Sequence, residues 1–505
     1  MRGKSDLFHL IQKMSRSEKR YFTLDAQKGG SKGSKYLKLF QAINGMDEYD
    51  ETKLKKKFPK NLSSDKSYLY DAILRSMRDY RSSKSYAAQI KEKLLDFRYL
   101  HELGLYDQCE ERLKEAKELA EELGSTNALL EINYEERRLS NDLKRKGYEE
   151  EVERLITEKD KYLEDLKIEF EILDLHNWLL ALSVRRKEIK QVEHQQRLIG
   201  QFEKRYREAF DVDKELPAVA AHRKYQCLGM YYSLIQDEEK MYEYFEKAMN
   251  WWEEHIKYKE EEHYRYILDV SNLVFASFVK GRFDNIPKLL DVLENEANEN
   301  SHANSVSFQK LTNYRLMYFI NTGNFDGAAE FIKKLEIKLD TDLVTESGRL
   351  VLISNAACLL FVMERYSESV EWTEKIIKGR RTEFRQDIQQ AVRILNLIAT
   401  YEEGEIDKME LVIRAYSRYY QEKTSIQKND FEFIMLDYGK RLLNTVSEKK
   451  VLLELKKYIN IEKQNSDAKI PAGIDDLLLF WIQSKEDRVS IGTVIKKEAA
   501  TMAAA

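Results

Sequence analysis

Residues 322–326 read Thr-Gly-Asn-Phe-Asp, and this short phrase is one copy of a turn that recurs along the chain. Related turns, each between two runs of apolar residues at helical spacing, occupy residues 103–107, 280–284, 364–367 and 403–407. The large apolar residues of the last four turns, Phe283, Phe325, Tyr366 and Ile406, are separated by 42, 41 and 40 residues. A nearly constant period of this length predicts stacked structural repeats.

The same period continues toward the N-terminus. Tyr106, Tyr148 and Ile189 are separated by 42 and 41 residues. A degenerate unit near Glu238 bridges the two sets, with spacings of 49 and 45 residues. With a further unit near Glu448, we expect eight or nine units between residues 86 and 465.

Each turn carries residues that end one helix and begin the next. A glycine two residues before the marker provides a left-handed conformation at a helix C-terminus without steric cost, at Gly104, Gly281, Gly323 and Gly404. Apolar or small residues follow three and seven positions after most markers, which gives the second helix one apolar stripe. Each unit is therefore predicted to be a pair of antiparallel helices of about 17 residues.

One such pair cannot bury its apolar faces alone and has to stack on its neighbours. We therefore predict an all-α fold, a right-handed α-solenoid of about eight or nine helical hairpins with a period of 40–42 residues. The pattern Gly-x-aromatic-Asp-x-x-small resembles the tetratricopeptide-like superfamily over residues 86–465. The unit here is longer than the usual 34 residues, the Trp-Leu-Gly-Tyr opening is absent and no proline closes the units.

The two ends differ from the repeats. Residues 1–85 are predicted to form a small helical cap, with a capping box at Ser15–Glu18. Residues 466–505 are predicted to hold a last apolar helix at 475–483, followed by a flexible Ala-rich tail from Lys496. Leu477–Ile482 is apolar all round, which fits either burial in the last repeat or contact with a second copy of the protein.

Composition restricts the class of protein. The 505 residues include only 4 Pro and 19 Gly with 43% hydrophobic and 34% charged residues, which argues against a barrel, a sandwich or a disordered chain. No apolar run approaches the roughly 18 residues that cross a bilayer, so we expect no membrane segment. Three widely spaced cysteines, Cys109, Cys227 and Cys358, are expected to be reduced core residues of a cytoplasmic protein.

Charge is unevenly distributed. Residues 1–100 hold 23 Lys plus Arg against 12 Asp plus Glu, a balance of +11, and the remaining residues have a balance of −15. The basic head could dock on its own acidic body or meet an anionic partner. The residues that could contact phosphates in this head are Lys32, Lys35, Lys55, Lys56, Lys57, Lys66, Arg75 and Arg78.

Two segments of the head have alternative interpretations. Residues 29–35 combine glycines and lysines, but not in the order of a phosphate-binding P-loop, and a connecting loop is favoured. Residues 51–80 could form a helix-turn-helix, although a turn of about five residues is longer than usual and a solenoid also needs a polar cap.

No catalytic or metal-binding motif is present. His255 and His263, with several glutamates around them, lie about 12 Å apart on one helix, which is too far to share an ion. We therefore expect a solvated helix face there, and no catalytic residue, cofactor, metal or small-molecule substrate in this protein.

A solenoid usually binds partners on the concave side, which the first helix of each pair lines. Asn272, Tyr314 and Asn355 lie eleven residues before successive markers and should form a row, with Tyr225 and Arg393 on the same side. These residues could bind a peptide backbone or could close hydrogen bonds between repeats. We predict a non-enzymatic scaffold that binds a protein or peptide; the alternative is a nucleic-acid-associated regulator that uses the basic head.

Overall fold

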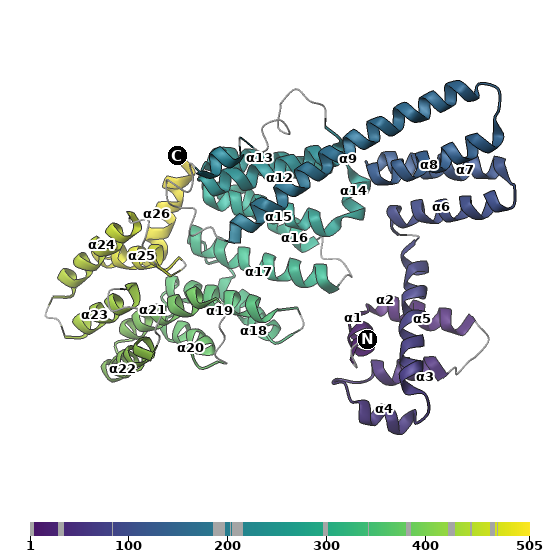
Figure 1. The fold of residues 1–505 in the computed structure, drawn as a ribbon. Coiled ribbons are helices and arrows are strands. Elements are labelled where there is room, and N and C mark those ends of the chain that lie inside the picture. Colours follow the sequence, from purple (N-terminus) through teal and green to yellow (C-terminus); the bar gives the residue numbers. More distant parts are fainter. Residues whose placement is uncertain are drawn as a thin grey trace.

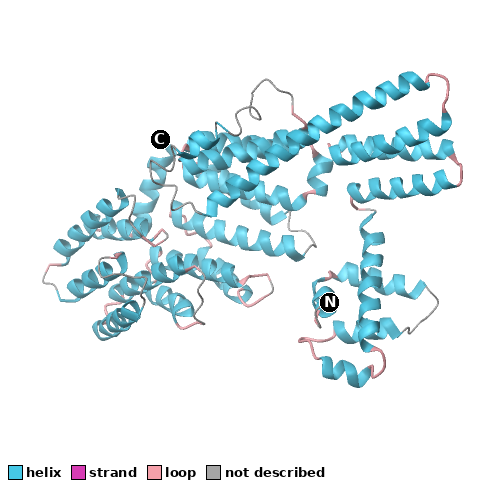
Figure 2. Cartoon of the chain, in the orientation of Figure 1, coloured by secondary structure: helices cyan, strands magenta, loops and turns pink. Residues whose placement is uncertain are grey.

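The computed structural model describes residues 5–28, 35–82, 84–184, 197–202, 204, 216–295, 301–341, 343–379, 385–422, 430–444, 447–464, 470–471 and 473–504. Within these ranges the secondary structure is helical and no strand occurs (Figure 2). The expected all-α class is thus confirmed. Helices that follow one another along the sequence pack side by side, as in a helical solenoid (Figure 1).

The head is a separate group of helices with its own core. It comprises α1 (Asp6–Lys13), α2 (Arg16–Lys28), α3 (Lys35–Asn44), α4 (Glu51–Lys57) and α5 (Leu62–Ser82). All the residues of its hydrophobic cluster lie between positions 7 and 80. The expected capping box is present, because the Ser15 N–H donates to Glu18 and the Glu18 N–H donates to the Ser15 hydroxyl. In Figure 1 the head is joined to the body through α5, which packs against α6.

The first part of the body departs from the expected hairpins. Helices α6 (Tyr86–Glu102), α7 (Tyr106–Glu122) and α8 (Thr126–Leu143) pack in sequence. The next helix, α9 (Tyr148–Val184), continues for 37 residues, where the period predicted a break between two helices. This stretch holds neither Gly nor Pro, so nothing in its sequence ends the helix. Its first half packs on α8 and its second half on α12.

The rest of the body follows the predicted pairing. Helices α15, α17, α19, α21 and α23 are the first members of successive pairs and contact one another in sequence order. The elements are α12 (Ala218–Ile235), α13 (Glu238–Glu254), α14 (Ile256–Glu261), α15 (His263–Lys280), the 3-10 turn η2 (Phe283–Asn285), α16 (Ile286–Asn295), α17 (Ser301–Thr322), α18 (Ala328–Lys338), α19 (Glu346–Val362), α20 (Tyr366–Ile377), α21 (Gln386–Glu402), α22 (Ile406–Glu422), α23 (Phe431–Asn444), α24 (Glu448–Gln464), α25 (Ile474–Asp487) and α26 (Ile491–Ala504).

The turn glycines and the apolar stripe are both confirmed. The four predicted glycines have φ between +65° and +76°, the left-handed region that other residues adopt at a cost. Among residues three positions after the marker, Cys109, Met241, Ile286, Ala328, Ser369 and Met409 are buried, whereas Val192 lies outside the described residues. The stripe therefore lies in the core of these six units, whereas the unit marked by Tyr148 has the exposed Glu151 at this position.

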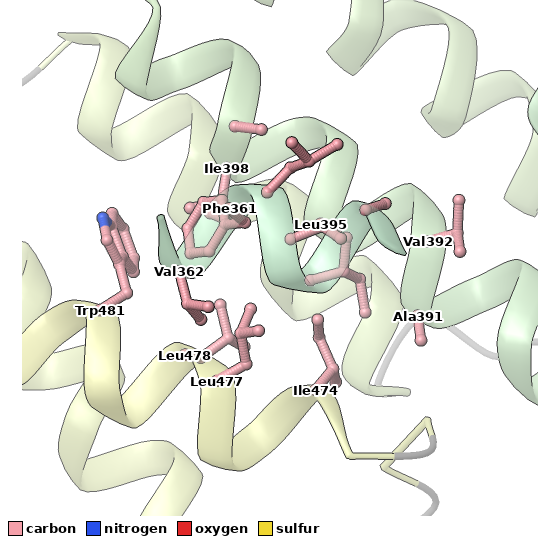
Figure 3. Close-up of a cluster of buried hydrophobic side chains, with 14 of the residues drawn as sticks. Phe361, Val362, Ala391, Val392, Leu395, Ile398, Ile474, Leu477, Leu478 and Trp481 are labelled. Atoms are coloured by element: carbon pink, nitrogen blue, oxygen red, sulfur yellow. The ribbon is translucent and has the colours of Figure 1, made fainter. Parts of the chain in front are cut away.

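The last two helices fold back on the body. Leu477, Leu478 and Trp481 of α25 project toward the side chains of α19 and α21 (Figure 3). The Trp481 indole N–H donates to Glu402 over 2.8 Å. Burial within the protein thus accounts for the apolar Leu477–Ile482 run, the first of the two explanations considered for it.

Residues 496–504 form the second half of helix α26, and not the irregular tail that their alanine content suggested. Helix α26 packs on α17 and runs over the turns that join the helix pairs. The Ile491 N–H donates to Glu364 over 2.9 Å, and a Cβ on Gly323 would meet the Gly492 carbonyl oxygen at 2.7 Å. These tertiary contacts anchor the start of the helix, and the high helix propensity of alanine favours its continuation.

We predict that Trp481→Ala destabilises the C-terminal part of the body. The side chain is fully buried, so its removal leaves a cavity and takes one of two partners from Glu402, which keeps Lys485, at a cost of about 3–5 kcal/mol. Urea unfolding followed by circular dichroism measures this loss. Val489→Ala, at a side chain 41% exposed, is the control and should change stability by less than about 0.5 kcal/mol. Equal stability of both variants would contradict the packing of α25.

The cysteines are all free thiols, as expected. Cys109 and Cys227 are buried and their thiols point at the carbonyl oxygens of Phe97 and Ile172, at 3.7 and 3.8 Å. Cys358 is half-buried against the core that surrounds α19. Burial raises the pKa of Cys227 to about 12, so its reactive thiolate is scarce at neutral pH.

We therefore expect Cys227 to resist alkylation in the folded protein. At pH 8 its thiolate fraction should be roughly a thousandfold below that of an ordinary thiol, because the raised pKa keeps the proton on sulfur. Iodoacetamide labelling with peptide mass mapping tests this, and the same protein in guanidinium chloride should label at all three cysteines. Rapid labelling of Cys227 under native conditions would show that α12 is not packed as described.

Candidate partner-binding groove

A groove crosses the first helices of successive pairs in the middle of the body. Its larger part, a cavity of about 870 Å³, is lined from α12, α13, α15, α17, α19 and α21, and by Gly473 before α25. A smaller part of about 580 Å³ lies between α9, α12 and α15. Ser233 and Phe275 line both parts, so the two are continuous. We call the whole feature the inner groove.

The larger part combines apolar side chains with amides. Phe275, Met317, Val351 and Ile388 provide apolar walls. Asn313 and Asn355 face each other from α17 and α19, and the Asn355 amide donates to the Asn313 carbonyl oxygen over 2.7 Å. A side-chain amide has two donors and two acceptor sites, so this bond leaves capacity for a ligand. Such a surface can hold apolar side chains while it hydrogen-bonds a peptide backbone.

The structure divides the predicted row of groove residues. Asn272 lines the smaller part of the groove and Asn355 the larger part. Tyr314 instead donates its hydroxyl to the Ser271 carbonyl oxygen over 3.0 Å, which ties α17 to α15. Arg393 is buried, donates to the Gln389 carbonyl oxygen over 2.7 Å and lies 3.8 Å from the Tyr419 ring centre. Tyr225 is half-buried on α12 and lines neither cavity.

Tyr314 and Arg393 are therefore packing residues, the alternative that the sequence left open. Their substitution would disturb contacts between helices before it disturbed a ligand. The groove residues that the sequence did not single out include Phe275, Arg223, Arg265 and His176. The sequence contained one signal for this site. Arg223 and Arg265 are 42 residues apart, which is one repeat period and predicts that they lie on the same face of successive first helices.

The smaller part of the groove carries the charge. Arg223 of α12, Arg265 of α15 and His176 of α9 line it. Arg265 pairs with Glu262 over 3.1 Å. Burial lowers the pKa of the Arg223 guanidinium, and the nearby charge of Arg265 acts in the same direction. Burial and Arg223 likewise lower the pKa of His176, so its imidazole is neutral at pH 7.

A buried carboxylate below this pocket joins three helices. Asp269 of α15 is 1% exposed and accepts hydrogen bonds from His222, Gln226 and Trp252, at 2.8, 2.7 and 2.9 Å. Its donors come from α12 and α13, so one side chain fixes the positions of α12, α13 and α15. A buried charge needs such partners, because each bond offsets part of the lost hydration.

The basic residues predicted to meet phosphates fall into two groups. Lys35 pairs with Asp65, Lys55 pairs with Glu51 over 3.2 Å, and the Lys66 ammonium donates to the Tyr49 hydroxyl over 2.7 Å. Those with exposed side chains and no ion pair in the described part of the protein are Lys56, Lys57, Arg75 and Arg78. Lys32 lies outside the described residues.

The histidine segment is not one solvated helix. Helix α13 ends at Glu254 and the short α14 precedes α15, so His255 and His263 lie on different elements. The His255 ring stacks on Trp251, with ring centres 3.8 Å apart. Glu260 and Glu261 accept hydrogen bonds from Tyr86 and Ser85, which fastens this segment to the start of α6. The glutamates here bind the protein itself, which corrects the expectation of a solvated face.

Comparison of the sequence and fold with protein-family models, with curated proteins and with solved structures finds no match. Of the helices described, none has the length and apolar character needed to cross a bilayer. In the described ranges no group of three or more His, Cys, Asp or Glu side chains is placed to hold a metal ion. The inner groove and the head are therefore the candidate functional surfaces.

Asp269→Ala should be strongly destabilising. It would leave three buried donors without an acceptor, each at a cost of about 1–3 kcal/mol, so we expect a loss of about 3 kcal/mol or more. Thermal and urea unfolding monitored by circular dichroism provide the measurement. Asp291→Ala, at an exposed carboxylate on α16, is the matched control and should be nearly neutral. A neutral effect at position 269 would show that these three helices are held by other contacts.

Proposed function

We propose that this protein is a non-enzymatic helical-repeat scaffold that binds an extended segment of another protein along the inner groove. The observation that carries the proposal is the groove itself. It crosses successive first helices and has apolar walls beside side-chain amides that keep hydrogen-bonding capacity for a ligand. Both kinds of group are needed to hold a peptide, because the backbone requires hydrogen bonds and the side chains supply apolar area.

The dimensions of the groove suit a short peptide. The larger part runs from α12 through α15, α17 and α19 to α21. Packed helices lie about 8–10 Å apart, so four such steps span roughly 35 Å. An extended peptide rises about 3.3 Å per residue, so about ten residues would fill that length.

The wider architecture belongs to the same proposal. We assign the body to a tetratricopeptide-like solenoid of eight or nine hairpins with a right-handed superhelix. The repeat period, the left-handed turn glycines and the pairing of neighbouring helices support this assignment. We place the protein in the cytoplasm, which the free buried cysteines support, because thiols persist in reducing compartments.

Site-specific photo-crosslinking tests the proposed groove. A benzophenone amino acid in place of Phe275, which both parts of the groove share, should capture a partner segment in the producing cell. The same probe in place of Leu411, 65% exposed on α22, is the control for nonspecific contacts. We expect one defined adduct at position 275, lost on Asn272→Ala, and none at 411. Adducts of equal yield at both positions would contradict the proposal.

A second candidate function is contact of the head with nucleic acid, as part of a regulator in which the acidic body senses a signal or recruits a partner. Lys56, Lys57, Arg75 and Arg78 are exposed and have no ion pair in the described part of the protein, and the head has its own core apart from the body. Free surface cations bind phosphates mainly through release of counterions, which makes the affinity sensitive to salt.

This second function predicts binding of DNA or RNA that weakens steeply between 50 and 200 mM salt, by about tenfold or more. Replacement of Lys55, Lys56 and Lys57 by Gln should reduce both the affinity and the salt slope in electrophoretic or anisotropy assays. The matched control replaces Lys449, Lys450 and Lys457 on α24, three exposed lysines of the body. Absence of binding at low salt, or equal loss in both triple variants, would exclude the function.

A further inference from the structure

The smaller part of the inner groove, which we call the Arg223 pocket, holds a cation that makes no ion pair with the described residues. Arg223 is half-buried, and no hydrogen bond or ion pair joins its guanidinium to any described residue. Burial of a charge without a partner costs free energy, so such a group is expected to find an anion. The acidic side chains near Arg223 do not serve as this anion, because they are bonded to other residues.

Each carboxylate near Arg223 accepts a hydrogen bond or forms an ion pair with another residue. Asp269 accepts from His222, Gln226 and Trp252, so its oxygens are occupied by donors below the pocket. Glu262 pairs with Arg265. Glu169 of α9 accepts from the Thr126 hydroxyl; burial raises its pKa and the charge of Arg223 lowers it, so the two groups interact at a distance, without a hydrogen bond or ion pair between them.

The pocket has the donors and the walls for one carboxylate. Arg223 and Arg265 line it with Asp269, and Glu262 pairs with Arg265, so Arg223 is the lining cation whose donors have no acceptor among the described residues. A carboxylate has two oxygens that match the paired N–H donors of one guanidinium. His176 adds no charge at neutral pH, because its pKa is lowered. Leu173, Leu180 and Met230 make the surroundings apolar, which strengthens a charge-assisted hydrogen bond.

The position of the pocket relates it to the rest of the groove. Phe275 and Ser233 join it to the larger part, where amides and apolar side chains lie. Asn177 and Asn272 line the same pocket and could hold the backbone beside the carboxylate. An extended peptide in the groove would therefore bring one end to Arg223.

We propose that the Arg223 pocket binds a carboxylate of the peptide segment, supplied by an acidic residue or by the free C-terminus of that peptide. This inference rests on the proposed scaffold function and specifies its partner as a peptide with a negative charge at the end that lies near α9 and α12. Arg223 makes the charge-assisted hydrogen bonds, and Phe275 lies where the charged pocket meets the apolar part of the groove.

Fluorescence anisotropy with three pools of ten-residue peptides tests the inference on the full-length protein. The first pool carries Asp or Glu and an amidated C-terminus, the second replaces them with Asn or Gln, and the third is the second with a free C-terminus. We expect the first or third pool, or both, to bind about tenfold or more tightly than the second. The pool that gains affinity identifies the source of the carboxylate.

Two variants separate the role of Arg223 from a general effect of charge. Arg223→Gln should remove the preference for carboxylate and leave the melting profile unchanged, since Arg223 makes no described ion pair. Arg414→Gln removes an exposed charge on α22 and should preserve the preference. A fourth pool with phosphoserine should bind no better than the first, and tighter binding would replace carboxylate by phosphate and overturn the proposal.

The outcomes also separate this inference from the scaffold function. Equal binding of the first three pools, or a preference that survives in Arg223→Gln, overturns the carboxylate site. If Phe275→Ala then weakens all pools equally, the groove remains a peptide site without charge selection. Binding of no pool overturns the carboxylate inference, and the crosslinking at position 275 then decides the scaffold function independently.

Discussion

The apolar stripe on each second helix can be buried only against neighbouring helices, and this requirement shapes the whole body. These stripe residues are buried because the next pair of helices packs against the helices that carry them; examples are Cys109, Ile286, Ala328 and Met409. The series needs an end, since the last pair would otherwise expose its apolar face. Helices α25 and α26 meet that need by folding back on α17, α19 and α21, where Trp481 and Ile482 are fully buried.

Helices α25 and α26, which cover the C-terminal end of the body, also limit the surface that can bind a partner. Because α25 lies against α19 and α21, it covers part of the face formed by the first helices, and Gly473 before it lines the larger cavity. The inner groove lies along the rest of this face. Its geometry depends in turn on Asp269, which fixes α12, α13 and α15 and uses its oxygens in doing so. Asp269 is thus engaged with His222, Gln226 and Trp252, and Arg223 makes no ion pair with it or with any other described residue.

The candidate site was only partly readable from the sequence. Asn272 and Asn355 were identified because repeat spacing places equivalent positions in one row, and both line the groove. Tyr314 occupies an equivalent position but turns its hydroxyl to the backbone of α15. Repeat spacing gives the face of a helix on which a residue lies. It does not give the rotamer or the neighbour that decides whether a polar group bonds within the protein or stays available.

The sequence by itself determined the helical class, the turns and the buried stripe, because glycine conformation and apolar periodicity act within a few residues. Tertiary structure decided the continuity of α9 through an expected break, the anchoring of the start of α26, and the contact of Glu260 and Glu261 with the start of α6. It also decided which groove cation makes no ion pair with the described residues. Each of these depends on residues far apart in the sequence that come into contact only after the helices have packed. Such contacts cannot be predicted from the local sequence.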